Sequence, residues 1–397
     1  MSVTISGILP ASTHLSGNII EIKATTSGIP AGASEYKILL KIVSADNILF
    51  GTPFMDAIAP DSAGVARFDI SGLVDQNVNK DFYWPIPTQY EGRWHGYVNL
   101  VYDIILIPGE MYVNQSNVLV ENWQATFGTI FIVKGKLNDL VLSQLNQSNN
   151  TWFDYFCAGG RWFTYQPLTQ YITPYQPIKL WWKPPTTGLN FTLNAKGYYS
   201  DGSVKNYADL PTMWYDVMFE FELQPSGLGF PPIDGDAKLL KFEVWMTGTP
   251  SVEKRTFIID WAYHEEVWFL LADNQIGGID CISLTGAIAY NPSGERKITG
   301  KPFEKGMAIK QRTQIVSGNK RTRRWQINSG YKSKAEMTAL DVLLDTPNAW
   351  LLMPPIGGTD FINQYSIVPV IITSTEMQLT DSMLDQESID IEITEAY

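Results

Sequence analysis

The segment Tyr36-Lys37-Ile38-Leu39-Leu40-Lys41-Ile42 decides the fold, because its apolar residues alternate and would fall on one face of an extended chain. The same period of two recurs at residues 19–24 and at residues 389–393, where isoleucine alternates with Asp390 and Glu392. Groups rich in glycine, proline, asparagine and aspartate separate many such short stretches. The sequence therefore predicts a mainly all-β protein of tandem β-sandwich or barrel-like domains with one or two short helices.

Helical signals are few, and they help to divide the chain. Residues 334–344 carry apolar side chains at helical spacing, with Ser333 able to cap the start and Pro347 closing the stretch. Residues 136–145 form a weaker amphipathic stretch. We expect three parts: an N-terminal β-sandwich over 1–135, an aromatic-rich middle β domain over 136–264, and a C-terminal β domain over 265–397. The last part is expected to contain a basic hairpin and one short helix.

Composition and charge limit the classes of function. Aromatic residues make up 13% of the 397 residues, charged residues only 18%, and the net charge is −12. Many aromatics with few charges favour sheets and large buried contact surfaces. An acidic chain gains no general attraction to phosphates, so we do not expect DNA contact.

Other classes of function lack their sequence signals. The two cysteines, Cys157 and Cys281, lie far apart and suggest ordinary buried thiols, and the three histidines lack metal-ligand spacing. We therefore expect no metal site and no cofactor. The chain begins without the basic and apolar regions of a secretory signal, and no run of about 18 apolar residues predicts a membrane span.

The sequence offers few catalytic constellations. Neither a Gly-x-Ser-x-Gly elbow nor a phosphate-binding glycine loop occurs. The acidic and aromatic stretch 260–266 offers Asp260, Glu265 and Glu266 as the carboxylates of a glycoside hydrolase. Glu265 and Glu266 are adjacent, however, and would face opposite ways on a strand. A solvated connection between domains is the interpretation we favour, and we expect no enzyme activity and no catalytic residues.

Paired aromatics in the middle part suggest a binding surface. Rings exposed in a row stack on sugars, and subunit interfaces use the same residue types. Adjacent rings on one strand face opposite ways, so half of each pair is expected in the core. The candidate glycan or interface aromatics are Trp181, Trp182, Tyr198 and Tyr199.

The C-terminal part separates its charges along the chain. Residues 296–334 carry twelve basic residues against Glu304, whereas residues 376–397 carry seven acidic residues and no basic one. A solvated hairpin with a turn at 317–320 is one interpretation. We favour complementarity between copies, with a basic face of Arg296, Lys297, Lys310, Arg312, Lys320, Arg321, Arg323 and Arg324. The acidic partner face would comprise Asp381, Asp385, Glu387, Asp390, Glu392 and Glu395.

Several segments resemble virion proteins of phages and prophages of Bacteroidetes hosts. The stretch 268–286 contains an apolar strand, then Asn-Gln-Ile-Gly-Gly, an acidic residue and a second strand. A basic hairpin, the segment Trp325–Tyr331, a short helix and the strands at 349–352, 368–372 and 389–393 follow in the order typical of these proteins. In the N-terminal part, the stretch 64–74 matches a recurring Phe-Asp-Ile-Ser segment, and the resemblance is weakest over 140–250.

This resemblance implies a structural protein of the phage tail or baseplate, comparable to a distal tail protein or a tail-ring subunit. Crass-like phages, whose short tails are built of stacked rings, are one source of such proteins. The expected partners are other virion proteins and copies of the same chain in a ring-like homo-oligomer. The expected location is the tail region of the virion after synthesis in the host cytoplasm. A glycan-binding adhesin at the tail tip, whose partner is a host glycan, is the alternative.

Overall fold

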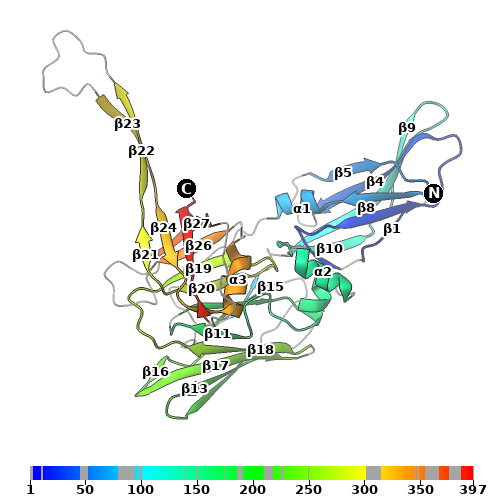
Figure 1. The fold of residues 1–397 in the computed structure, drawn as a ribbon. Coiled ribbons are helices and arrows are strands. Elements are labelled where there is room, and N and C mark those ends of the chain that lie inside the picture. Colours follow the sequence, from blue (N-terminus) through cyan, green and yellow to red (C-terminus); the bar gives the residue numbers. More distant parts are fainter. Residues whose placement is uncertain are drawn as a thin grey trace, which may run out of the picture. The chain divides into compact units, whose positions relative to one another are not determined.

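The computed structural model describes residues 3–9, 12–44, 52–78, 94–97, 101–137, 139–148, 151–174, 176–185, 191–209, 218–223, 225, 228–248, 250–300, 314–344, 346, 348–353, 366–374 and 386–396. Side chains are not described at 94–97, 101, 139, 140, 146, 209, 222, 295–300, 314–321, 366, 386 and 387. The chain is mainly β, with several sheets and few, short helices, as the sequence predicts (Figure 1). It divides into two compact units. Unit 1 comprises Met1–Thr164, Pro177–Phe257 and Asn274–Ile279, and unit 2 comprises Tyr165–Gln176, Ile258–Asp273 and Asp280–Tyr397.

Two sheets and one core form the N-terminal part of unit 1. The first sheet has the order β1-β3-β6 (Val3–Ser6, Glu21–Thr26, Val65–Asp69). The second has the order β2-β10-β8-β4-β5 (Thr13–Leu15, Gly128–Val133, Val101–Val113, Ser34–Ser44, Phe54–Ile58), with β9 (Leu119–Trp123) paired to β8. Ile38, Leu40 and Ile42 of β4 are fully buried in the core, which confirms the period-2 prediction. Helix α1 (Ser71–Asn77) adds Val74 to this core.

The rest of unit 1 holds the aromatic core. One sheet has the order β12-β15-β7 (Ile178–Trp182, Met218–Leu223, Trp94–Tyr97). The other contains β18-β17-β13-β14 (Val252–Ile259, Ala237–Thr247, Thr192–Tyr199, Val204–Asp209), with β16 (Ile233–Asp234) on β17. The helical elements are α2 (Asp139–Gln147) and the π-helical turn η2 (Asp154–Ala158). Every residue of β12 is buried, so both faces of this strand are covered.

Unit 2 is built on a seven-stranded sheet. Its order is β20-β19-β26-β27-β29-β24-β21 (Ile279–Leu284, Trp268–Asp273, Ala349–Met353, Ser366–Ile372, Asp390–Glu395, Arg324–Asn328, Ile288–Tyr290). Helix α3 (Lys334–Leu344) has the range that the sequence predicts and buries Met337, Leu340 and Leu343 against this sheet's core. A short pair joins β25 (Lys332–Ser333) to β28 (Gln386–Glu387), and β11 (Thr169–Ile172) also belongs to unit 2.

Pro369 lies in an interior strand, because β27 lies between β26 and β29. The pairing of β27 with β29 covers only Val370–Ile372, so the proline sits just outside that ladder. Its missing N–H is therefore tolerated in an interior strand.

A two-stranded ribbon extends the edge of this sheet. Strand β22 (Ser293–Gly300) follows β21, strand β23 (Gln314–Thr322) precedes β24, and the two pair with each other in antiparallel register (Figure 1). The predicted turn at 317–320 is wrong, because these residues lie inside β23 and Gly318 and Asn319 stand opposite Lys297 and Arg296. A bulge between Lys297 and Ile298 accommodates the shift in register.

The boundaries of the three expected parts remain predictions. The N-terminal sheets have a core of their own, and most of the middle part belongs to the same compact unit. The chain enters unit 2 first at Tyr165 and again at Ile258, and Asn274–Ile279 belongs to unit 1. Among the described residues, no helix is long and apolar enough to cross a membrane.

We predict that truncating an inward residue of β3 will destabilise the N-terminal sandwich. Ile22 is fully buried, whereas Ile19, just before the strand, is 77% exposed. Ile22→Ala should lower the free energy of unfolding by about 2–5 kcal/mol, because it leaves a cavity in the core. The control Ile19→Ala should change it by less than about 0.5 kcal/mol. Urea unfolding measures both, and equal effects would show that β3 does not face a packed core.

Candidate functional site

The predicted glycan shelf is not formed by the four aromatics that the sequence singled out. Trp181, Trp182 and Tyr199 are at most 3% exposed and belong to the interior of unit 1. Trp182 packs edge-on against Phe191, with ring centroids 4.8 Å apart. The expectation that half of each pair would face outward was wrong for Trp181 and Trp182, because covered faces on both sides bury the whole of β12.

Tyr198 is the one half-buried member of this set. Its hydroxyl donates a hydrogen bond to Glu243 Oε2 at 3.1 Å. The Lys241 ammonium lies 4.5 Å from the centre of its ring and occupies a ring face that a sugar would need. The residues named for glycan stacking therefore offer no sugar-binding platform.

The acidic stretch after β18 lies inside unit 2, so it does not connect the two compact units, and its residues make polar contacts. Asp260 accepts a hydrogen bond from Ala262 N at 2.8 Å, and its other oxygen lies 3.1 Å from His264 Nε2. Glu265 and Glu266 are exposed, and Glu266 accepts a hydrogen bond from the Trp268 indole at 3.2 Å.

The basic and acidic segments meet at the base of the ribbon. Strand β24 follows directly after β23 and pairs with the acidic strand β29. Arg323 Nε lies 3.7 Å from Glu395 Oε2, and Arg324 is exposed beside it. Asp390 accepts hydrogen bonds from Gln326 and Asn328, while Glu392 is exposed. Some of the predicted charge complementarity is thus satisfied within one chain.

The remaining residues of the two faces divide into two groups. Arg296, Lys297, Lys320 and Arg321 lie on the ribbon and Glu387 lies on β28, where only the backbone is described. Lys310, Arg312, Asp381 and Asp385 lie outside the described residues. Pairing of these charges between copies remains a prediction.

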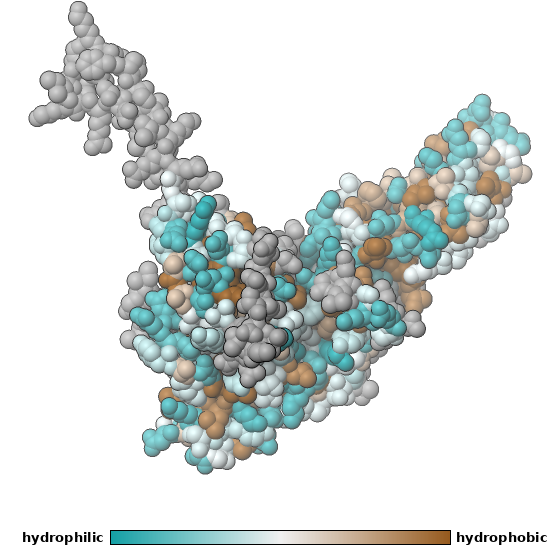
Figure 2. Space-filling model, viewed as in Figure 1, coloured by the Kyte–Doolittle hydropathy of each residue, from teal (hydrophilic) through white to brown (hydrophobic). Residues whose placement is uncertain are grey.

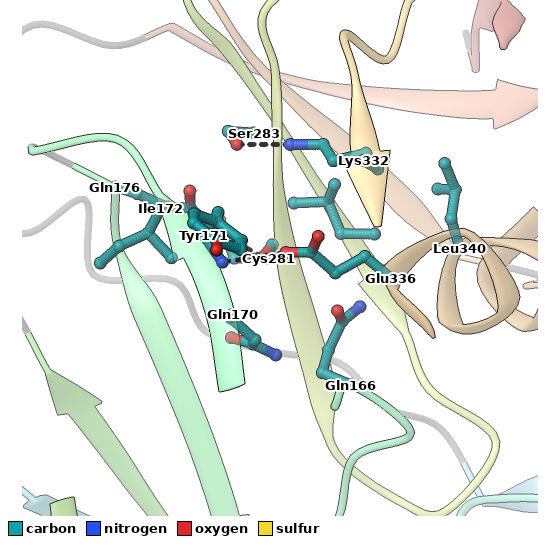
Figure 3. Close-up of a pocket in the computed structure, with 11 residues that line it drawn as sticks. Gln166, Gln170, Tyr171, Ile172, Gln176, Cys281, Ser283, Lys332, Glu336 and Leu340 are labelled. Atoms are coloured by element: carbon teal, nitrogen blue, oxygen red, sulfur yellow. Dashed lines mark hydrogen bonds between the residues drawn. The ribbon is translucent and has the colours of Figure 1, made fainter. Parts of the chain in front are cut away.

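A cavity in unit 2 brings together polar residues that the sequence did not single out as a group (Figure 3). The centre of a water molecule can move within about 20 Å³ of this cavity, so the cavity has room for one or two water molecules. The lining residues come from β11, β20, β25, α3 and the segments that flank β11: Gln166, Gln170, Tyr171, Ile172, Gln176, Cys281, Ile282, Ser283, Lys332, Glu336 and Leu340.

A buried lysine contacts a buried serine in this cavity. Lys332 Nζ lies 3.0 Å from Ser283 Oγ, and the two residues are 8% and 2% exposed. Gly330, two residues before Lys332, has φ of +72°, and a Cβ there would collide with the Thr285 hydroxyl. Because only glycine fits this turn, the chain leaves β24 in the direction that places Lys332 beside β20.

Neighbouring groups hold the other polar side chains in place. Glu336 accepts hydrogen bonds from Ser333 N at 3.0 Å and Ser333 Oγ at 2.7 Å, as in a capping box, and from Tyr171 N at 3.0 Å. This confirms that Ser333 lies at the start of α3, as predicted. Gln176 donates to the backbone oxygen of Cys281 at 3.1 Å, and Cys281 itself is half-buried.

Burial lowers the pKa of the Lys332 ammonium below its ordinary value of 10.5, and the negative charges of Glu336, Asp260 and Cys281 oppose that shift. Burial also raises the pKa of the Cys157 thiol to about 12, which makes this second cysteine, in unit 1, a poor nucleophile. Among the described residues, no group of three or more His, Cys, Asp and Glu side chains could hold a metal ion.

Comparison with known proteins adds no identification. No protein-family model matches the chain, and no curated protein matches its sequence. The chain is therefore defined by its own structure, as a mainly β protein of two compact units with a two-stranded ribbon and a small polar cavity.

We predict that Lys332 makes the stability of unit 2 depend on alkaline pH. The unfolded chain keeps the lysine proton up to about pH 10.5, whereas the folded chain releases it at a lower pH. The free energy of unfolding should therefore rise as pH increases through this window, and Lys332→Met should remove that part of the rise. Lys334→Met, at an exposed position, is the control. Identical pH dependence of the wild type and Lys332→Met would contradict the assignment.

Proposed function

We propose that this chain is a structural protein of a bacteriophage virion, a repeated subunit of the tail, baseplate or tail-ring assembly that acts through protein–protein interfaces. The observation that carries the proposal is the ribbon β22–β23. Its strands have eight and nine residues, and in the described part of the chain they form a sheet of two strands only.

Such a ribbon has little stability of its own. A two-stranded hairpin is at best marginally stable in water, because it lacks a second layer to bury its side chains. Eight extended residues span roughly 26 Å. Each strand also keeps one edge of backbone N–H and C=O groups outside the pair. A ribbon with these properties gains most when a neighbouring protein covers it.

The charges of the chain favour a second copy as that neighbour. The ribbon carries Arg296, Lys297, Lys320 and Arg321 against Glu295, whereas the chain as a whole has a net charge of −12. An acidic body attracts a basic arm from another copy of itself. Contacts that join two different surfaces of identical subunits close into rings when the rotation between subunits allows it.

Exposed apolar residues are less informative. Met55, Leu119 and Leu9 of the N-terminal sandwich are 60%, 56% and 74% exposed. On the face seen in Figure 2, apolar residues of this sandwich lie scattered among polar ones. Scattered apolar residues are normal on a protein surface, so the ribbon remains the better indication of an interface.

We predict that the purified chain forms a closed homo-oligomer at low salt and that its mass falls as salt rises, because the contact is electrostatic. Light scattering measures the mass. The double variant Arg296→Glu/Arg321→Glu should shift the mass toward the monomer. The control Lys37→Glu/Lys238→Glu reverses two charges at exposed positions of unit 1 and should leave the mass unchanged.

A chain that stays monomeric at every salt and protein concentration would contradict self-assembly. Equal effects of the two double variants would contradict a specific role for the ribbon. Mass spectrometry of purified phage particles tests the virion assignment itself, which requires many copies of the chain per particle.

A further inference from the structure

The Ser283–Lys332 contact has the features of a catalytic serine–lysine pair. The two side chains come from β20 and β25 and meet at 3.0 Å within the buried part of unit 2. Figure 3 shows the pair at one end of the cavity, Gln166 and Gln170 at the other, and Cys281, Tyr171 and Glu336 between them. A nucleophile and a base within hydrogen-bond reach, both bordering a cavity, are the geometric requirement for covalent catalysis.

We propose that Ser283 and Lys332 form a nucleophile–base pair that cleaves esters of short carboxylic acids through an acyl-Ser283 intermediate. This activity goes beyond the assembly role. It also departs from the non-enzymatic expectation, which rested on the lack of a catalytic constellation in the sequence. Ser283 and Lys332 lie 49 positions apart.

The environment of Lys332 suits it to act as the base. A serine hydroxyl needs a neutral amine to accept its proton, and burial favours the neutral form of Lys332. The groups that oppose this effect are Glu336 on α3, Asp260 before β19 and Cys281 on β20. Glu336 is already engaged by three hydrogen bonds, from Ser333 N, Ser333 Oγ and Tyr171 N, which hold its carboxylate in place.

The size and lining of the cavity define the class of substrate. Space for one or two water molecules admits a small acyl group, such as acetyl, and excludes a long chain. Gln166, Gln170 and Gln176 make part of the lining polar, which suits a polar carboxylic ester group better than a hydrocarbon. The alcohol portion of the ester would remain outside.

Water is the only reactant that the proposed ester cleavage needs besides the ester itself. The Ser283 proton passes to Lys332 Nζ as the Oγ–carbonyl bond forms. The ester C–O bond then breaks, and the leaving alcohol takes the proton from the Lys332 ammonium. Water attacks the acyl-serine and gives its proton to Lys332, which returns it to Ser283 as the carboxylic acid leaves.

The test uses the full-length chain and p-nitrophenyl acetate, with quenched samples digested and Ser283 acetylation measured by mass spectrometry. We expect acetyl-Ser283 in the wild type, formed faster as pH rises through the lowered pKa of Lys332. Ser283→Ala should abolish the modification at this position. Lys332→Met should slow it by about 100-fold or more, the usual contribution of a general base.

One control distinguishes this mechanism from acyl transfer through a surface amine. Lys334→Met removes an exposed amine and should leave the rate of Ser283 acetylation unchanged. Loss of the circular dichroism signal would show that Lys332→Met has unfolded. In that case the pH dependence of Ser283 acetylation in the wild type still tests whether Lys332 is the base. No acetylation of Ser283, or a rate that does not rise with pH below the ordinary lysine pKa of 10.5, would overturn the proposal. The oligomer mass does not depend on this chemistry, so the two proposals can fail separately.

Discussion

The antiparallel hydrogen-bonded ladder that joins seven strands in unit 2 is the interaction on which both functional proposals depend. Strand β20 is at one end of this sheet and supplies Ser283 and Cys281 to the cavity. Strands β24 and β21 form the other end and continue into the ribbon. The core under α3 fixes the register between these ends, because a slip of one residue would turn every buried side chain outward.

Burial has a different consequence in each unit. In unit 1 it places Trp162, Trp181 and Trp182 in the interior, where aromatic rings contribute large contact areas. Unit 1 also buries Lys179 in direct contact with Glu220, each side chain 4% exposed, so these charges compensate each other. In unit 2, Lys332 is buried against a neutral hydroxyl, and this arrangement favours the uncharged amine. A buried amine beside a hydroxyl and a cavity is a costly arrangement for stability alone, which is why we assign it a chemical role.

Local patterns predicted the elements, whereas long-range packing determined the sites. The alternation at 36–42 and at 389–393 predicted buried strand faces, and the apolar spacing with Ser333 predicted the full range of α3. The Ser-Gly-Asn-Lys sequence at 317–320 resembles a turn, but its pairing with β22 holds it in a strand. The sequence analysis expected one of the two tryptophans of β12 to face outward, but both are buried. The sequence of a strand does not reveal that other elements cover both of its faces. Ser283 and Lys332 carry no joint sequence signal, since only the sheet and the turn at Gly330 bring them together.

The proposed assembly requires that the ribbon of one chain is covered by another chain. Hydrogen exchange of the backbone amides in β22 and β23, compared between the assembled protein and the monomer obtained at high salt, tests this requirement most directly. We expect strong protection in the assembly, and exchange in the monomer that is far faster than in β19 and β26 of the sheet. Equal protection of the ribbon in both states would contradict the proposed assembly, because it would show that the ribbon is stable without a partner.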